Sequence, residues 1–408
     1  MLWVKIAWRN LWRNRRRTGI QLAVIIGSMF LAVFYINFAD GALATMVDAG
    51  VRSGSGDIGI YRQGYLADPK ASDTFAAAPI LAGLARDPDV AKAFARLRVP
   101  GLLQSAYGSR PVEMEGLDFA REAGTDPLLD RKYFVAGGLP HAPHGIVIGL
   151  TLARDLKVKV GNKIVWMAQD TTGQIASGLF RVAGVVHTNV SAVDSGLVMA
   201  PREAVASLIG RAGGVHEIAI LLKDPNQLRQ ALARIGPLLK AVPGTRAYPW
   251  QKAMPDLAAL IEISASKQKF SVFILFAIVA IGTLNTMLMS VMERTREFGM
   301  MRAIGISRRA IGQMIMAEAL VLSVVGAAGG LALAVLVGLR TSTAGIDMSK
   351  ILAGMDIGVA INPIIKTGWD WPATAALFAG AVVLCLMASL YPVRWALRIR
   401  PADAMRTY

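Results

Sequence analysis

Four stretches of this sequence are each long and apolar enough to cross a lipid bilayer as an α-helix. A bilayer core takes roughly 20 apolar residues of helix, because every backbone polar group must be bonded internally where no water is available. Hydrophobic residues make up 54% of the chain and charged residues only 18%, which excludes an ordinary soluble protein. We therefore predict an α-helical membrane protein with four transmembrane helices, located at Ile20–Ala39, Phe270–Met292, Gln313–Leu339 and Trp371–Val393.

The formal net charge of +16 is concentrated beside these stretches. The basic residues that precede the first stretch, separate the second from the third and follow the fourth are Lys5, Arg9, Arg13, Arg15, Arg16 and Arg17; Arg294, Arg296, Arg302, Arg308 and Arg309; and Arg394, Arg398, Arg400 and Arg406. The positive-inside rule assigns all three regions to the cytoplasm. This distribution excludes nucleic acid as a partner and predicts a multi-pass protein of the bacterial inner membrane with both termini cytoplasmic.

This topology divides the chain into a series of segments. They are a cytoplasmic amphipathic helix (1–17), a first transmembrane helix (18–45), an extracytoplasmic, periplasmic domain (46–268), a second transmembrane helix (269–292), a cytoplasmic helix (293–310), a third transmembrane helix (311–339), a short periplasmic loop (340–370), a fourth transmembrane helix (371–393) and a cytoplasmic tail (394–408). A cleaved signal peptide is the alternative for the first stretch, since Ala42-Leu43-Ala44 resembles a cleavage site. A signal peptide has an apolar region of only about 7–15 residues, so we expect this longer stretch to remain as a helix.

The large inserted domain is predicted to be α+β. Runs of β-branched and apolar residues predict strands at Asp57–Tyr61, Val112–Leu117, Lys163–Met167, Phe180–His187, Leu197–Met199 and Glu217–Leu222, and a strand running into a helix at Val147–Val158. Helices are expected at Arg202–Ile209 and Gln227–Leu239. The strand-rich segment 146–239 suggests one of two subdomains. The single cysteine, Cys385, lies in the fourth stretch, so the domain contains no disulfide.

No catalytic or metal-binding motif is evident in the 408 residues. A G-x-x-x-x-G-K-[ST] phosphate loop does not occur, so ATP-driven work needs a partner. His216-Glu217 begins like a zinc-protease signature, but Ile220 occupies the position of the second histidine, which favours the start of a strand. His141 and His144 alone underfill a four-ligand zinc site. We expect no catalytic residue, no metal and no cofactor bound by this chain, and hence no enzyme activity of its own.

A few polar and small residues lie at membrane depth. Asn285 in the second stretch and Glu318 in the third are costly there unless they are paired. Two interpretations of Glu318 remain open: a contact that couples helix movement to the cytoplasmic side, or a buried hydrogen bond that holds two helices together. Gly326 and Gly330 permit close approach of another helix, either within the chain or in a dimer.

The cytoplasmic segment from Glu293 to Gly305 is the most informative part of the sequence. It is predicted to form a short charged helix with an apolar stripe of Phe298, Met301 and Ile304, which suits docking into a groove on a partner. A solvated connector is the alternative interpretation.

This segment resembles the motif E-R-x-x-E-[IFV]-[GA]-x-x-[RK]-A-[LI]-G of the MacB-type permeases of ABC transporters, a family that includes LolC, LolE and FtsX. The positions that match are Glu293, Arg294, Glu297, Phe298, Gly299, Arg302, Ala303, Ile304 and Gly305. Further segments resemble the family in the same order: Ala7–Leu11, Glu318 with Gly326 and Gly330, Tyr391–Ala396 and Pro401–Arg406. The resemblance covers the whole architecture.

The resemblance implies a permease that dimerises with a second copy or a paralogue, each copy resting on an ABC ATPase subunit. ATP and Mg would then bind the partner ATPase. The coupling contacts would be made by Glu293, Arg294, Glu297, Phe298, Gly299, Met301, Arg302, Ala303 and Gly305, and helix packing or coupling in the membrane by Asn285, Glu318, Gly326 and Gly330.

The expected function is extraction or expulsion of an amphiphilic substrate, a lipoprotein or lipid, at the outer face of the inner membrane. One alternative is MacB-like efflux of a drug or peptide with a periplasmic adaptor. Another is FtsX-like signalling that activates a periplasmic hydrolase. The lipoprotein-releasing members carry a Pro-containing hook for a soluble carrier, whereas this chain has only residues 169–176 in its place, which argues against carrier recruitment.

Overall fold

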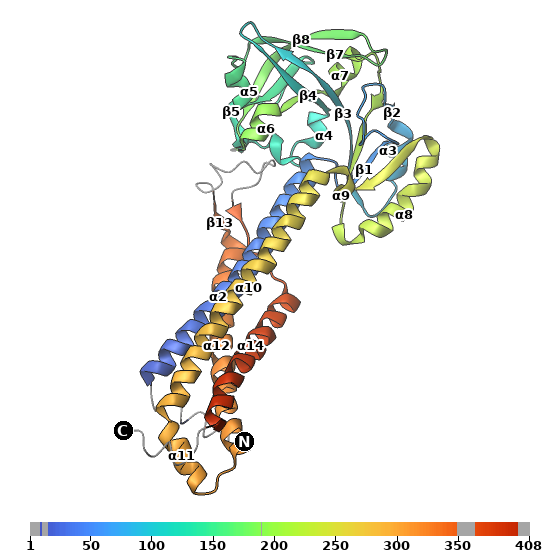
Figure 1. The fold of residues 1–408 in the computed structure, drawn as a ribbon. Helices are drawn as coiled ribbons and strands as arrows, with labels where there is room; N and C mark the ends of the chain where they lie inside the picture. The colour runs from blue at the N-terminus through green and yellow to red at the C-terminus, as the bar shows by residue number, and fades with distance from the viewer. Residues whose placement is uncertain (1–8, 10–14, 189, 349–363, 399–408) are drawn as a thin grey trace. The chain divides into compact units, whose positions relative to one another are not determined.

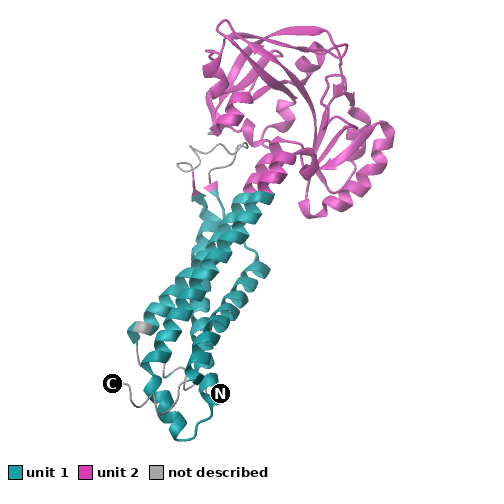
Figure 2. Cartoon of the chain, viewed as in Figure 1, with its two compact units in different colours: residues 1–43, 262–346, 365–408 teal, residues 44–261, 347–364 magenta. Residues whose placement is uncertain are grey.

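The structure, a computed structural model, describes residue 9 and residues 15–188, 190–348 and 364–398. It divides into two compact units (Figure 2). Unit 1 comprises residues 1–43, 262–346 and 365–408, and unit 2 comprises residues 44–261 and 347–364. Most of the predicted amphipathic helix at 1–17, residues 349–363 of the predicted loop and the tail motif at 401–406 lie outside the described residues.

Unit 1 is built from long apolar helices, shown in Figure 1. The helices apolar enough to span a membrane are α2 (Arg15–Ser53), α10 (Pro255–Glu293), α12 (Arg308–Ala344) and α14 (Trp371–Arg398), and among the described residues these are the four candidates. A short helix, α11 (Thr295–Ala303), joins α10 to α12. The four predicted transmembrane helices are therefore confirmed as helices. Both α2 and α10 are longer than predicted, because they continue without a break into unit 2.

Small residues bring α12 close to α2 within unit 1. A Cβ atom added to Gly326 would lie 2.6 Å from Cγ2 of Ile25, and one added to Gly330 would lie 2.6 Å from the Ile26 carbonyl oxygen and from Cβ of Met29. The space that both glycines leave is therefore filled by α2 of the same chain. Of the two packing partners considered for this pair, the intrachain helix is the one that the structure contains.

We predict that Gly330→Ala destabilises the full-length protein by about 1–3 kcal/mol, because the added methyl group has no room beside the α2 backbone. Thermal unfolding in detergent measures this effect. Gly27→Ala on α2 is the matched control, since a Cβ there meets no atom within 4 Å. Equal melting temperatures for the two variants would contradict the predicted tight contact.

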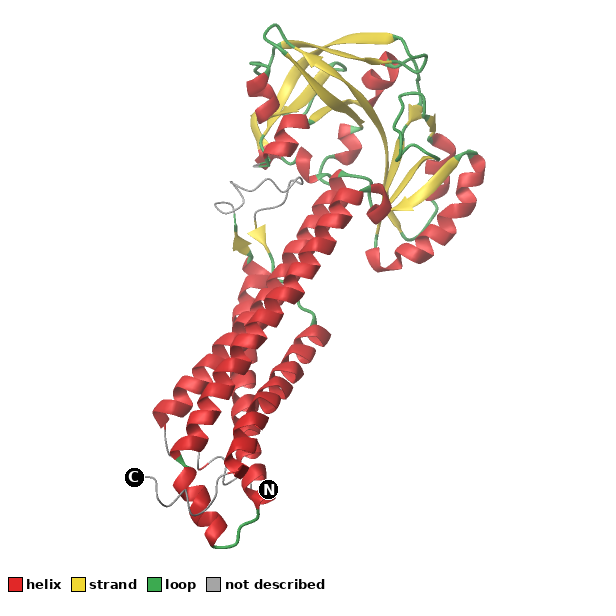
Figure 3. Ribbon diagram, viewed as in Figure 1, coloured by secondary structure: helices red, strands yellow, loops and turns green. Residues whose placement is uncertain are grey.

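Unit 2 contains a first lobe in which helices cover an antiparallel sheet (Figure 3). Its strands are β12 (Thr245–Pro249), β1 (Ile58–Arg62), β11 (Glu217–Leu222) and the first part of β3 (Val90–Gln104), in that order. Helices α3 (Ala78–Leu84) and α8 (Leu228–Leu238) bury Ile80, Leu84, Ala231 and Ile235 in a core with Ile58, Ile60, Ile218 and Ile220. Chain segments from both ends of the domain therefore form this lobe.

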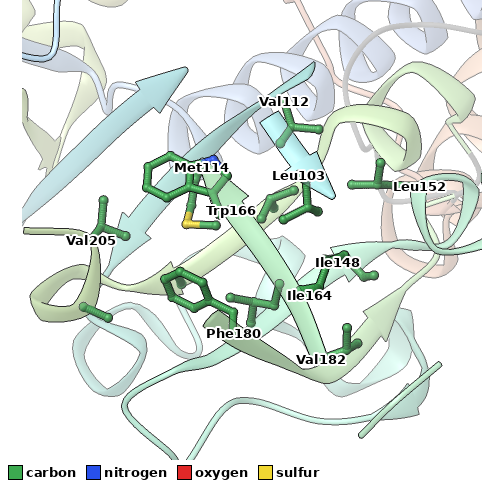
Figure 4. Packing of buried hydrophobic residues seen from close by; sticks show 14 of the residues in the cluster. Leu103, Val112, Met114, Ile148, Leu152, Ile164, Trp166, Phe180, Val182 and Val205 are labelled. Carbon is green, nitrogen blue, oxygen red and sulfur yellow. The ribbon is translucent and has the colours of Figure 1, made fainter. Parts of the chain in front are cut away.

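The second lobe is a closed ring of strands around an apolar interior. The second half of β3 pairs with β4 (Ser109–Leu117), and the ring continues through β9 (Val198–Pro201), β6 (Gly145–Gly149), β8 (Ile175–Val186) and β7 (Lys163–Gln169) back to β3. Figure 4 shows the side chains that fill it, among them Leu103, Trp166 and Phe180. Closure leaves the ring without a free edge, which limits pairing with other chains.

Shorter elements complete unit 2. The strands are β2 (Phe75–Ala76), β5 (Phe134–Gly137) and β10 (Gly214–Val215), and the helices are α4 (Phe119–Glu122), α5 (Leu150–Asp155), α6 (Ser191–Gly196), α7 (Arg202–Leu208) and α9 (Trp250–Ala253). Single 3-10 turns lie at Pro127–Leu129, Arg131–Tyr133, Pro225–Gln227 and Leu239–Ala241. Short strands β13 (Ile346–Asp347) and β14 (Ile364–Ile365) flank the undescribed loop residues.

The predicted α+β class and most predicted strands are confirmed, but the suggested subdomain boundary is wrong. The first lobe draws on residues before 96 and after 214, so it cannot be separated from the second by one cut at residue 146. The cause is β3, a long strand that contributes to both lobes and was not predicted. Pro100-Gly101 interrupts its sequence pattern, since proline and glycine are poor strand formers.

Candidate functional site

The segment with the family-like motif forms a compact joint between α10, α11 and α12. Helix α10 ends at Glu293, and Arg294 leaves the helical conformation with φ −103° and ψ 14° before α11 begins. At the other end, Gly305 has φ +98°, a conformation that side chains with a Cβ rarely adopt. The Ser307 side chain then caps α12 by accepting a hydrogen bond of 3.2 Å from the Ala310 N–H. Gly305 in the motif is therefore required by the backbone turn.

A buried ion pair fastens this joint to the third spanning helix. Arg294 Nη1 donates to Oε1 and Oε2 of Glu318 at 2.8 and 3.0 Å, and its Nε donates to Oε2 of Glu297 at 3.0 Å. Only 8% of Arg294 and 5% of Glu318 are exposed. The Arg294 guanidinium also lies over the Phe298 ring, 5.2 Å from its centroid. Glu318, for which two interpretations were open, therefore bonds the joint that carries the motif.

Phe298 is the apolar counterpart of this ion pair. It is 2% exposed and packs in a core with Met287, Val291, Ile311, Met314, Ile315, Ala319, Val393 and Ala396. These residues belong to α10, α12 and α14, so the α11 helix is anchored to three long helices at once. The expectation that Phe298 shares an outward stripe with Met301 and Ile304 is wrong, because Phe298 points inward and Met301 packs against the same core.

The exposed face of the joint is made by other residues. Met300 is 48% exposed and Ile304 is 83% exposed, with Arg296, Arg308 and Arg309 also exposed nearby along the chain. Of the remaining motif positions, Glu293, Ala303 and Gly305 are exposed, Glu297 and Arg302 are half-buried, and Gly299 is buried. Met300 was not among the predicted contact residues, although its spacing of four residues from Ile304 places both on one side of a helix.

Asn285 is exposed on α10 in the single chain, whereas its neighbours Thr283 and Thr286 are more buried. Thr286 donates to the Gly282 carbonyl at 2.7 Å, and Thr283 Oγ1 lies 3.6 Å from Cys385 Sγ on α14. No contact among the described residues therefore supports the packing role predicted for Asn285.

Unit 2 contains a buried polar cluster around Glu217. Its Oε1 accepts from the Tyr61 hydroxyl and its Oε2 accepts from Arg98 Nε, both at 2.7 Å. Burial alone would raise the pKa of Glu217, but the charges of Arg98 and Arg96 outweigh burial and hold that pKa below its usual value. Glu217 is therefore a fully paired structural carboxylate.

His216 belongs to the same cluster. Its Nδ1 accepts from the Arg98 N–H at 3.2 Å, its Nε2 lies 3.1 Å from the Ala71 carbonyl, and its ring stacks on Tyr65. Burial lowers its pKa, which favours the neutral ring. The described residues contain no group of three or more potential metal ligands, and β11 begins at Glu217 as the sequence predicted.

A second buried cluster joins Arg96, Glu122 and Asp126. Arg96 Nε and Nη2 donate to Glu122 Oε2 at 2.8 and 2.5 Å. Asp126 Oδ1 accepts from the Leu128 N–H at 2.9 Å, while its buried Oδ2 has no hydrogen-bond partner among the described residues. Burial raises the pKa of Asp126 to about 7, against the opposing effect of Arg96 and of the bond from Leu128. Neither Arg96 nor Glu122 was predicted to have a role, because 26 residues separate them in the sequence.

A pH dependence of stability follows from Asp126. Because the pKa of Asp126 in the folded protein, about 7, exceeds its ordinary value of 3.8, the protonated carboxyl stabilises the fold fully below pH 4, and that stability is lost as pH rises through 7. We predict that Asp126→Asn, a neutral mimic, gains on the order of 2 kcal/mol relative to wild type between pH 5 and pH 8. Thermal unfolding of the full chain at both pH values checks this. A constant difference between variant and wild type would refute it.

The Arg294–Glu318 pair yields a further prediction. Glu318→Gln leaves the Arg294 charge buried without its main partner, which should destabilise the protein by about 3–5 kcal/mol. Unfolding of the full chain in nanodiscs measures this loss. The control is Arg296→Gln at an exposed position of α11, which should change the free energy of unfolding by less than about 0.5 kcal/mol. Similar losses of unfolding free energy in both variants would show that the Arg294–Glu318 pair contributes no more to stability than an exposed charge does.

Comparison with known proteins gives two family matches. Residues 20–238 match the family described as MacB-like periplasmic core domain, and residues 269–401 match FtsX-like permease C-terminal. Among curated proteins, the pyoverdine export ATP-binding/permease protein PvdT of Pseudomonas syringae pv. syringae (strain B728a) is 28% identical over 429 residues, covering 98% of this chain and 59% of that protein. The protein of the same name from Pseudomonas aeruginosa is 27% identical over 428 residues, with 98% and 58% coverage. This chain therefore spans less than two thirds of the length of these relatives.

Solved structures show a distant likeness to part of the chain. The periplasmic region of MacB from Actinobacillus actinomycetemcomitans aligns with a TM-score of 0.35 and 14% identity, covering 49% of this chain and 91% of that one. The extracellular domain of the noncanonic ABC-type transporter YknZ from Gram-positive bacteria aligns with a TM-score of 0.33 and 14% identity, covering 47% and 98%. The MacB-like periplasmic core match alone covers more than half of the sequence, and with the permease match it shows that the chain belongs to the MacB/FtsX family of ABC transporter permeases.

Proposed function

We propose that this chain is the membrane subunit of an ABC transporter that extracts or expels an amphiphilic substrate, such as a lipoprotein or lipid, at the outer face of the bacterial inner membrane. In this proposal ATP and Mg bind an ABC ATPase outside the 408 residues, which contain no phosphate loop. The proposal includes a second permease copy or paralogue and cytoplasmic termini. The observation that carries it is the construction of the α11 joint.

The joint has the properties of a mechanical contact. Phe298 and the Arg294–Glu318 pair fix α11 to the long helices from the inside, so a load applied to α11 reaches α10, α12 and α14. Met300 and Ile304 remain exposed on its outer side, with basic residues beside them. An apolar pair with a basic surround suits a hydrophobic groove with an acidic rim on the ATPase.

The site of transport work is proposed from the polarity of the helices. Each spanning helix has a mean hydropathy of 2.2–2.5 over its most apolar window, so the bundle offers few groups to solvate a polar solute. We therefore propose that substrate is handled by unit 2, called the MacB-like domain below because most of it lies within the matched residues 20–238. Its β7–β8 turn is held by Asp170 Oδ1, which accepts from the N–H groups of Thr172 and Gln174 at 2.8 and 2.9 Å. So short a turn argues against recruitment of a soluble carrier.

Export of a small molecule through a periplasmic adaptor is the second candidate. The names of the curated relatives favour it, since they describe pyoverdine export. Lipid or lipoprotein release and small-molecule export make different predictions for the purified complex. Stimulation of ATP hydrolysis by a lipopeptide favours the first, and stimulation that requires an added adaptor protein favours the second.

We predict that Ile304→Asp weakens copurification of the ATPase by about tenfold or more, because a carboxylate would enter the apolar centre of the contact. The melting temperature should stay unchanged, since Ile304 is 83% exposed. Affinity purification of the tagged chain from its own host, with quantification of bound P-loop ATPase, measures the effect.

Ile175→Asp is the matched control for this experiment. Ile175 is 80% exposed but lies on β8 of the MacB-like domain, so the same substitution there should leave ATPase binding intact. Undiminished ATPase recovery with Ile304→Asp would contradict the docking face. A wild-type preparation that is fully active without any ATPase would overturn the proposed function as a whole.

A further inference from the structure

The C-terminal end of helix α2 is bound by a single buried arginine of unit 2. The last carbonyl groups of a helix have no partner within it and need donors from elsewhere. Arg96 Nη1 donates to the carbonyl oxygens of Ser53 and Gly54 at 2.7 and 2.6 Å, and Nη2 donates to that of Arg52 at 3.2 Å. A guanidinium also suits the negative end of the helix dipole. Arg96 therefore closes the end of the helix that continues from the first spanning segment.

The remaining donors of Arg96 are used by Glu122. Nε and Nη2 donate to the Glu122 carboxylate, while Nη1 and Nη2 donate to the carbonyl oxygens at the end of helix α2. The planar guanidinium of Arg96 is therefore bonded on two sides. Arg96 is 1% exposed and Glu122 is 0% exposed. Glu122 therefore holds the buried Arg96 side chain in one orientation. Loss of either residue would leave the other as an unpaired charge in the interior.

Arg96 lies at the point of β3 where the two lobes meet. Ala95, the residue before it, belongs to the core of the first lobe, and Leu97, the residue after it, belongs to the core of the second. The Arg96 carbonyl accepts a hydrogen bond of 3.1 Å from the His216 N–H on the neighbouring segment. A force applied to Arg96 would therefore reach both lobes through the same strand, β3.

We propose that Arg96 is a positioning residue that fastens the end of helix α2 to β3, so that a displacement of the helix moves both lobes of the MacB-like domain together. The inference rests on the proposed function, because the displacement would come from the ATPase. Beyond that function, the inference identifies Arg96 as the residue through which movement of helix α2 is transmitted to the domain. Further links of this helix to unit 2 are residues 54–57, which lead into β1, and Met46, which packs with Leu257 and Trp250.

Arg98 provides a matched control two residues further along β3. It forms ion pairs with Glu217 and Glu115 at 2.7 and 2.6 Å, so it is also part of a largely buried charge network of the same sheet. Its side-chain ion pairs are with Glu113 and Glu115 on β4 and Glu217 on β11, and not with helix α2. Arg98→Gln and Arg96→Gln therefore both remove a structural ion pair, but only Arg96→Gln releases the helix end.

The test uses two spin labels in the full chain in nanodiscs, on a background in which the single cysteine is removed by Cys385→Ser. One label replaces Ala44 on α2 and the other replaces Arg154 on α5, both of them exposed positions within unit 2. Pulsed electron resonance gives the distance distribution between them. Without nucleotide, we expect Arg96→Gln to widen this distribution about twofold, whereas Arg98→Gln keeps the wild-type width. Equal widths in all three proteins would overturn the attachment.

The same samples, with copurified ATPase, ATP and vanadate, test transmission. In wild type and in Arg98→Gln, helix and domain move together and the distance stays unchanged. In Arg96→Gln the domain lags behind the helix, so the mean distance shifts when nucleotide is trapped. Widening without any shift would show that Arg96 is only a structural cap and would overturn its role in movement.

Two further variants keep the test decisive. Arg96→Lys keeps a cation at the helix end but loses the planar fork, so it should give a width between those of wild type and Arg96→Gln. If Arg96→Gln fails to insert, this intermediate widening relative to Arg98→Gln is the test. Glu122→Gln leaves the carbonyl contacts of Arg96 in place but removes the carboxylate that orients it, so it should widen the distribution less than Arg96→Gln does. Failure of any ATPase to copurify contradicts the proposed function, but not the attachment, which the nucleotide-free widths decide on their own.

Discussion

The absence of water inside a bilayer is the constraint on which this structure depends. It requires each crossing segment to satisfy its own backbone hydrogen bonds, and the α-helix is the solution that a single segment can provide. Helices α2 and α10 extend this solution past the length that a membrane needs, since each runs for 39 residues without interruption. Each of these helices therefore contributes residues to both units.

Buried arginines occur where these helices end. Arg294 follows the last residue of α10 and pairs with Glu318, while Arg96 meets the last carbonyls of α2 and pairs with Glu122. At the end of α2 the Arg96 guanidinium binds a carboxylate and the helix carbonyls together, whereas after α10 the Arg294 guanidinium binds the carboxylates of Glu297 and Glu318. Such pairs contribute less to net stability than their distances suggest, because both charges lose their hydration. Their more certain effect is geometric, since a planar fork with several bonds permits one orientation.

The parts of the structure that depend on local composition were predictable from the sequence. The apolar length of the spanning helices, the α+β character of the inserted domain and the strand at Glu217 all follow from neighbouring residues. The pairing of Arg294 with Glu318 could not be predicted, because 24 residues separate them and the sequence does not show which carboxylate an arginine meets in the folded chain. Phe298 was assigned to the wrong face for a similar reason. A helical period shows that residues share a side, but the surrounding helices decide which side is buried. Strand β3 was missed because its role in two cores depends on contacts far apart in the chain.

The ring of strands in the second lobe has a consequence for how such a domain diversifies. Its hydrogen bonds close through β7 and β8, and the turn that joins these two strands lies beyond the last paired residues, Gln169 and Ile175. Lengthening a surface turn costs little free energy, because the entropy of loop closure grows slowly with length. Insertions there would leave the ring and its apolar interior intact. Relatives could therefore acquire new binding partners by elaborating one turn, while the strands that carry the fold stay the same.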